Sequence, residues 1–109
     1  MKTGDIYLVK FHPGFGDEYK KYRPAVVVSG KLGDIDARFA LIAPFTSNLK
    51  TNVPSHELLI ESNPALDSDS LLLSWYLLTV DAKGLVRKLG ELSPGDTKKL
   101  QQAVGNLFT

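Results

Sequence analysis

The sequence predicts one domain, residues 1–109, of mainly β structure with a single C-terminal helix, arranged as a small barrel or a strongly twisted sheet. Short runs of β-branched and aromatic residues, separated by turn residues, recur along most of the chain and are typical of antiparallel strands. After Ser93 the apolar spacing changes to that of a helix. A chain of 109 residues is long enough for one hydrophobic core and too short for two.

The first strand is expected at residues 6–11, where side chains of both sheet faces are apolar or aromatic. A second strand follows Pro24, because the run Val26-Val27-Val28 is typical of a strand that is buried on both faces. A proline fits the first position of a strand, where its missing N–H breaks no ladder bond. The loop that connects the two strands is about a dozen residues long, and a connection of this length is often functional.

The middle of the chain predicts more strands and two irregular segments. Residues 31–36 are expected to form a turn, and residues 61–70 an acidic loop whose carboxylates face solvent. Residues 70–80 are apolar on both alternating faces, which predicts either a central strand or one covered by a partner subunit. Strands are expected at residues 38–43, ending at Pro44, and at residues 57–60, 70–80 and 85–92.

A terminal helix is expected after Ser93, which has the properties of an N-cap. Pro94 suits the first helical position, and Asp96 approximates a capping box. The helical spacing then predicts one apolar stripe facing the sheet. Its members are Leu100, Val104, Leu107 and Phe108.

Composition excludes several classes of chemistry. The chain has no cysteine, so disulfides and cysteine-based zinc or thiol chemistry are excluded. His12 and His56 lack metal-ligand spacing, and no P-loop, dinucleotide fingerprint or nucleophile elbow is present, so no metal and no cofactor are expected. No apolar run reaches the roughly 18 residues of a membrane span and no signal peptide is apparent, so a cytoplasmic protein is expected.

Two groups of residues are candidates for binding a phosphate. Arg23 precedes a proline at a strand entrance, and a guanidinium held there can bind a phosphate through two parallel hydrogen bonds. The alternative is a surface arginine paired with Glu18 or Asp17. Thr46 and Ser47 follow the third strand, where their hydroxyls can bond a phosphate or a ribose, or else satisfy neighbouring backbone N–H groups in a turn.

The long loop combines cations with aromatic rings. Between Lys10 and Arg23, four basic residues alternate with phenylalanines and tyrosines. This mixture suits single-stranded nucleic acid, because cations contact phosphates and rings stack on bases. Alternatively, two of the rings close the core beneath the loop.

Several motifs occur in one order along the chain. They are Gly4-Asp5-Ile6-Tyr7-Leu8-Val9, Phe11-His12-Pro13, Gly16-Asp17-Glu18, Arg23-Pro24-Ala25-Val26-Val27-Val28-Ser29, Pro44-Phe45-Thr46-Ser47, Thr79-Val80-Asp81 and Leu89-Gly90-Glu91-Leu92-Ser93. This order resembles the MazF/PemK (Kid) family of toxin ribonucleases over nearly the whole chain. The resemblance implies an SH3-like barrel with a C-terminal helix, a homodimer, and a cytosolic bacterial toxin that an acidic antitoxin silences and that cuts single-stranded RNA without a metal.

The resemblance also implies roles for individual residues. Arg23 and Thr46 match the positions that carry the reaction in several family members, and Glu18 matches the glutamate of the preceding loop. Glu18 or His12 is the candidate general base. The residues expected to contact RNA are His12, Phe15, Tyr19, Lys20, Lys21, Tyr22 and Ser47.

One strand departs from the family pattern. Where members often carry Asp-Gln and then an arginine, this chain has Trp75, Tyr76 and Leu78. This departure keeps open an alternative function, a non-catalytic module of the same fold that binds a protein or RNA, as gyrase-poisoning toxins with a similar barrel do. A third possibility is a structural domain whose apolar strand serves only dimerisation.

Overall fold

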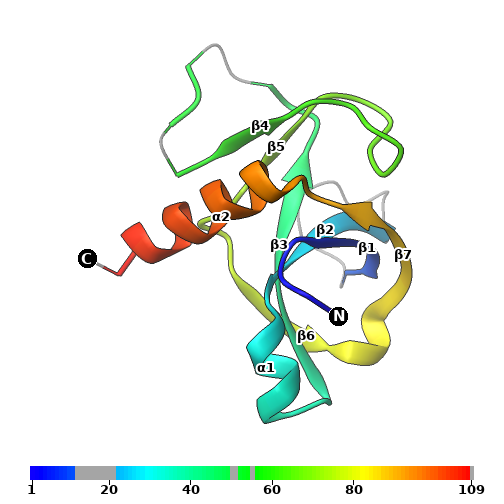
Figure 1. The fold of residues 1–109 in the computed structure, drawn as a ribbon. Helices are drawn as coiled ribbons and strands as arrows, with labels where there is room; N and C mark the ends of the chain where they lie inside the picture. Colours follow the sequence, from blue (N-terminus) through cyan, green and yellow to red (C-terminus); the bar gives the residue numbers. More distant parts are fainter. Residues whose placement is uncertain (12–21, 50–51, 55, 109) are drawn as a thin grey trace.

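The strands form one antiparallel sheet in the computed structural model, which describes residues 1–11, 22–49, 52–54 and 56–108 (Figure 1). The sheet order is β4-β5-β3-β2-β1-β7, and β6 also pairs with β3. The strands are β1 (Asp5–Lys10), β2 (Tyr22–Ser29), β3 (Phe39–Thr46), β4 (Leu58–Ile60), β5 (Ser70–Leu72), β6 (Leu78–Asp81) and β7 (Leu85–Glu91). The helices are α1 (Gly30–Ile35), the 3-10 turn η1 (Ala82–Gly84) and α2 (Pro94–Asn106).

The predicted class, mostly antiparallel β with a C-terminal helix, is confirmed. Among the described residues, no strand pairing joins β7 to β4 or β6, so the sheet curves without closing into a hydrogen-bonded barrel. No helix in these ranges is long and apolar enough to cross a membrane.

Strand β2 lies inside the sheet and is buried on both faces, as predicted. Val26 and Val27 have no exposed surface. Val26 packs in the larger core cluster with Ile6 and Leu100, whereas Ala25 belongs to a second cluster with Val9. The entrance to β2 is therefore held from both sides of the sheet.

Helix α2 begins as the sequence predicts, but its apolar stripe is only partly covered. The Ser93 hydroxyl accepts a hydrogen bond from the Asp96 N–H at 3.1 Å, and Leu100 is fully buried against the sheet. Leu107 and Phe108 are 39% and 77% exposed, so their predicted place against the sheet is wrong. The reason is visible in Figure 1, where the C-terminal end of α2 extends beyond the strands.

The turn expected at residues 31–36 is wrong, because this segment forms most of helix α1. The helix has only six residues and none of them is buried, so no apolar stripe marks it in the sequence. A contact from elsewhere in the chain helps to hold it, since the Thr3 hydroxyl accepts the Gly30 N–H at 3.0 Å.

Strand β2 begins at Tyr22, two residues before its predicted start at Pro24, because Tyr22 and Arg23 also pair with β1. Two further differences from the prediction lie along one edge of β3. Strand β3 continues through Pro44 to Thr46, because its partner on this edge changes there from β6, whose first residue lies opposite Ile42, to β5, whose last residue lies opposite Phe45. The missing N–H of Pro44 thus falls where the ladder is interrupted.

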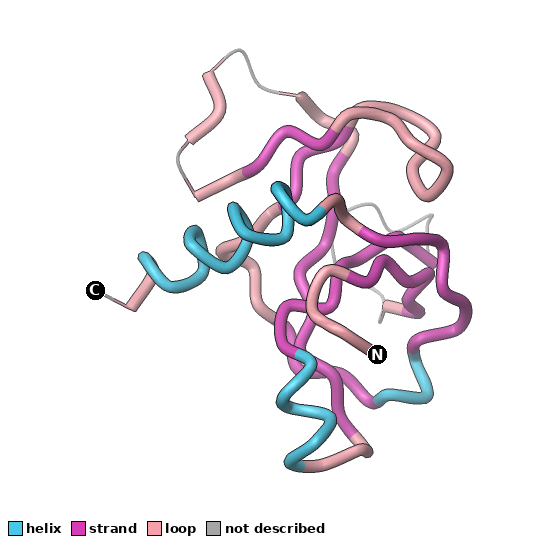
Figure 2. The backbone as a smooth tube through the Cα atoms, viewed as in Figure 1, coloured by secondary structure: helices cyan, strands magenta, loops and turns pink. Residues whose placement is uncertain are grey.

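The continuous strand expected at residues 70–80 is wrong for the same reason. It is divided into β5, which lies between β4 and β3, and β6, which pairs with β3 (Figure 2). The loop between them is fixed by buried Ser74, whose hydroxyl donates to the His56 carbonyl, and by the Leu73 N–H, which donates to the Pro44 carbonyl at 2.9 Å.

Candidate functional site

A cleft of about 860 Å³ opens where β2 begins and β3 ends. We call it the basic cleft, because Arg23 and Arg87 line it against one acid, Asp67, among the described residues. Its wall is completed by the loop before β5 and by β7. The lining residues are Leu8, Tyr22, Arg23, Pro24, Phe45, Thr46, Ser47, Asn48, Pro64, Ala65, Leu66, Asp67, Ser68, Ser70, Arg87 and Leu89.

Arg23 and Thr46 lie on neighbouring strands, and the sheet register brings them together. Strands β2 and β3 pair Val26 with Ala43 and Ala25 with Pro44. This ladder ends at Ala25 and Pro44, and Arg23 and Thr46 lie two residues beyond that pair on their strands. Both residues line the basic cleft.

The backbone explains why Arg23 is well held. It pairs with Val9 of β1, a residue with no exposed surface, and Pro24 restricts its backbone to the extended region. The side chain is half-buried and its Nε atom is buried. The backbone that carries the guanidinium is therefore held rigidly where β2 begins, as the sequence predicts.

The hydroxyl of Thr46 stabilises a turn and can still donate a hydrogen bond. Its oxygen accepts a hydrogen bond from the Asn48 N–H at 3.2 Å, which is the turn interaction that the sequence left open. A hydroxyl that accepts one bond still carries its own O–H. Thr46 can thus shape the turn and donate to a phosphate oxygen at the same time.

The structure brings together four of the predicted site residues. Arg23, Thr46, Tyr22 and Ser47 all line the basic cleft, and Tyr22 is 49% exposed there. The other predicted residues, Glu18, His12, Phe15, Tyr19, Lys20 and Lys21, lie outside the described residues, as does Asp17. Their roles, including that of the general base and the alternative pairing of Arg23, stay predictions.

Sequence reasoning missed Arg87, Leu89 and the wall formed by residues 64–68. Strand β7 was predicted, but nothing in its sequence shows that it pairs with β1 on the side opposite β2. The available signal was the alternation of side chains along a strand. Arg87 and Lys88 are adjacent, so their side chains project to opposite faces of the sheet.

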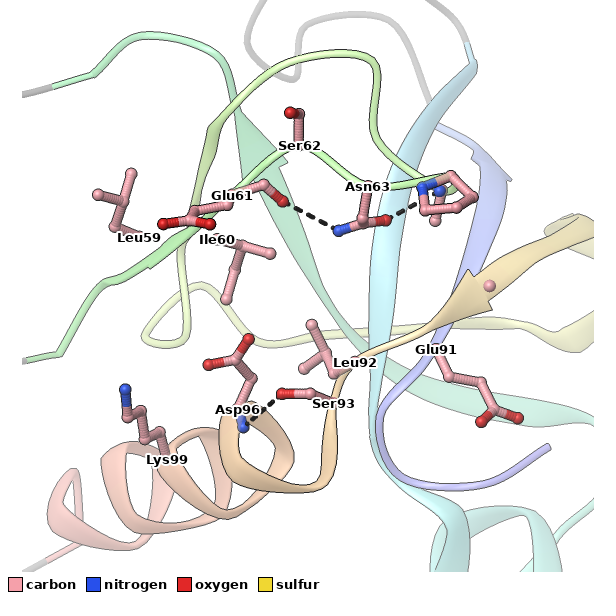
Figure 3. Close-up of a pocket in the computed structure, with 13 residues that line it drawn as sticks. Leu59, Ile60, Glu61, Ser62, Asn63, Glu91, Leu92, Ser93, Asp96 and Lys99 are labelled. Carbon is pink, nitrogen blue, oxygen red and sulfur yellow. Dashed lines mark hydrogen bonds between the residues drawn. The ribbon is translucent and has the colours of Figure 1, made fainter.

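A second cleft, of about 650 Å³, lies on the other side of the same loop (Figure 3). We call it the acidic cleft, because Glu61, Glu91 and Asp96 line it against Lys99. Asp96 and Lys99 rise from α2 toward Ile60 and Glu61 in Figure 3. Negative charge makes this cleft unsuitable for a phosphodiester backbone.

Glu91 is also part of an ion-pair cluster at the end of β7. Lys88 Nζ lies 2.9 Å from Glu91 Oε1 and 3.4 Å from Oδ1 of buried Asp5, and Lys2 Nζ lies 3.7 Å from Glu91 Oε1. The hydrogen bond from Lys88 lowers the pKa of Glu91, and the same bond raises the pKa of Lys88. Lys88 is therefore engaged in holding β7 to β1.

Trp75, Tyr76 and Leu78, which depart from the family pattern, have structural contacts here. The Trp75 indole N–H donates to the carboxylate of buried Glu57 at 2.7 Å, and the rings of Trp75 and Tyr76 lie 5.3 Å apart at 41°. Leu78 packs against the second core cluster.

Within the described ranges, no three His, Cys, Asp or Glu side chains are grouped so as to hold a metal ion.

Comparison with known proteins places the chain in a family. The family described as PemK-like, MazF-like toxin of type II toxin-antitoxin system matches residues 2–108. The chain belongs to this toxin family. An endoribonuclease MazF from Staphylococcus saprophyticus is 30% identical over 105 residues, covering 95% of this chain and 88% of that protein. The resemblance seen in the sequence is confirmed.

Solved structures agree on the fold. MazF from Deinococcus radiodurans matches with a TM-score of 0.77 and 19% identity, covering 99% of this chain and 96% of that one. An endoribonuclease in complex with its cognate antitoxin, from a Mycobacterial species, matches with a TM-score of 0.75 and 16% identity, covering 99% and 94%. These similarities support the fold described above, a sheet with a terminal helix.

Proposed function

We propose that this toxin-family protein is a metal-independent endoribonuclease that cleaves single-stranded RNA. The observation that carries the proposal is that Arg23 and Thr46, far apart in sequence, line one basic cleft at adjoining strand ends. The Staphylococcus saprophyticus relative, which bears the name endoribonuclease, supports the same reaction class.

In this reaction the ribose 2′-oxygen attacks the adjacent phosphorus and the bond to the 5′-oxygen breaks. The 2′-hydroxyl proton passes to a general base, and the departing 5′-oxygen takes up a proton. The products are a 2′,3′-cyclic phosphate and a 5′-hydroxyl. Arg23 stabilises the negative charge that develops on the phosphorane oxygens, and the Thr46 hydroxyl donates to one of them. Glu18 or His12 serves as the base.

The proposal includes the partners and the setting of the toxin. We propose an acidic antitoxin as the protein partner, a homodimer as the working assembly, and the cytoplasm as its location. The Mycobacterial endoribonuclease solved with its cognate antitoxin supports the first of these. The cleft then accepts single-stranded RNA only when the antitoxin is absent.

The test is RNA cleavage by purified protein in EDTA. The wild type is expected to give discrete fragments that end in cyclic phosphate. Arg23→Ala is expected to cleave roughly a hundredfold more slowly or worse, since a cation aimed at transition-state charge contributes a few kcal/mol. Arg38→Ala is the matched control, because Arg38 is exposed and its guanidinium binds Asp36 at 2.6 Å outside the cleft.

Two outcomes contradict the proposal. Intact RNA with the wild type indicates a non-catalytic binding module of the same fold. Equal rates for the wild type and Arg23→Ala mean that Arg23 does not carry the reaction.

A further inference from the structure

Strand β7 supplies a second guanidinium to the basic cleft. Arg87 pairs with Leu8 of β1, and Leu8 pairs with Pro24 of β2, so Arg87 lies two strands away from the residue after Arg23. Neighbouring strands are about 4.8 Å apart, which separates the backbones of β2 and β7 by about 10 Å. Both arginines line the same cleft, Arg23 from β2 and Arg87 from β7.

Arg87 differs from Lys88 and Arg38 in having no ion-pair partner among the described residues. Lys88, the next residue, binds Asp5 and Glu91, and Arg38 binds Asp36. Arg87 is exposed and makes no ion pair with any residue that the structure describes. Arg23 and Arg87 both line the basic cleft, whereas Arg38, the third arginine of the chain, is bound to Asp36 outside it.

A structural role for the Arg87 stem is compatible with this placement, since Leu8 and Leu89 also line the cleft and the aliphatic part can cover them. Such packing leaves the guanidinium in water at the cleft surface. A planar guanidinium with parallel N–H donors matches the two free oxygens of a phosphodiester. The chemistry of the exposed end thus fits the backbone of a nucleic acid strand.

We propose that Arg87 binds a phosphate that flanks the scissile phosphate held by Arg23, so that β2 and β7 grip one RNA strand at two points. This inference rests on the proposed function and names a residue for substrate binding. Arg87 does not contact the reacting atoms and is a positioning residue. It holds the RNA strand in the cleft and contributes equally to binding of the substrate and of the transition state.

The test is the salt dependence of binding. A mixed-sequence, single-stranded 2′-O-methyl RNA oligomer has no free 2′-hydroxyl and cannot be cleaved by this route, so fluorescence anisotropy measures binding alone. The logarithm of the association constant falls linearly with log salt, and each phosphate contact to a single strand makes this slope steeper by about 0.7. Arg87→Gln is expected to reduce the slope by about 0.7, whereas Arg38→Gln, with the same change in net charge, leaves the wild-type slope.

Two further measurements separate binding from folding and catalysis. Arg87→Lys keeps the charge, so it is expected to restore the slope while binding more weakly than the wild type, because an ammonium cannot make the paired contact. In cleavage assays, Arg87→Gln is expected to raise KM about tenfold with kcat unchanged, the pattern of lost uniform binding. The urea midpoint of each variant shows that it is folded.

The outcomes distinguish this inference from the proposed function. If the wild type cleaves RNA but Arg87→Gln keeps the wild-type slope and Kd, the inference is wrong and the nuclease stands. If the wild type leaves RNA intact but Arg87→Gln lowers the slope, the nuclease is wrong and the phosphate contact stands. An equal loss of slope in Arg38→Gln overturns the inference, because binding then follows net charge alone.

Discussion

The basic and acidic clefts share a wall and differ in charge. Pro64 and Ala65 line both of them, and β7 contributes to both. On one side the wall faces Arg23 and Arg87, and on the other it faces the acidic residues around α2. A phosphodiester strand carries one negative charge per nucleotide, so the two sides of one loop are opposite in their affinity for RNA.

Strand β7 contributes residues to both clefts. Arg87 and Lys88 are adjacent and carry the same charge, yet Lys88 binds Asp5 and Glu91 while Arg87 lines the basic cleft. Strand geometry makes this division, because successive side chains point to opposite faces. Changes on the basic side should therefore alter the reaction, and changes on the acidic side should alter stability.

After Arg23→Ala, the largest effect is expected from Thr46→Val, which replaces the hydroxyl by a methyl of similar size. Cleavage should slow about a hundredfold, because removal of one donor to a developing oxyanion costs about that much. The measurement is kcat on single-stranded RNA. Thr46→Ser keeps a hydroxyl and should retain most of the rate, whereas equal rates for the valine variant and the wild type would remove Thr46 from the reaction.

Local features of the sequence mark Arg23 and Thr46 as candidates, and the resemblance to the toxin family suggests their roles. A proline follows Arg23 and fixes its backbone, and Thr46 ends an apolar strand. No local feature of the sequence indicates that Arg87 lines the cleft, since its position depends on which strand pairs with β1. That pairing is a long-range property, and β7 is separated from β1 by most of the chain.

The fold shows the same division between local and long-range information. The N-cap at Ser93 and the buried β2 were predicted, because capping chemistry and β-branched runs are local signals. Helix α1 was missed because none of its residues is buried. The break between β5 and β6 was missed because it depends on the partners available along the edge of β3.

The wall between the clefts can be tested at Gly90. A Cβ atom placed there would lie 2.9 Å from the Ala65 Cβ, closer than real contacts allow, and neither group can turn aside. Gly90→Ala is expected to lower the free energy of unfolding by about 2 kcal/mol, a typical cost of overpacking. Urea denaturation measures the loss.

The matched control for this substitution is the double variant Gly90→Ala/Ala65→Gly. It removes the methyl group that the new side chain would meet, so most of the lost stability should return. This coupling is the expected sign of a direct contact. Purely additive effects of the two changes would mean that the loop containing Ala65 does not press on β7.

The smallest effect is expected from the ion pairs on the acidic side. Because Lys88 lowers the pKa of Glu91 in the folded state, Glu91 contributes stability above its ordinary value near 4.5 and loses it as the pH falls through the lowered pKa. Lys88→Gln should therefore make the acid decline in unfolding free energy shallower below that value. Glu91→Gln should do the same, and Lys88→Gln in that background should add only the loss of the contact with buried Asp5. Both carboxylate and ammonium are exposed, so 1 M NaCl should remove most of the difference, and an effect that survives such salt would place the contact in the interior instead.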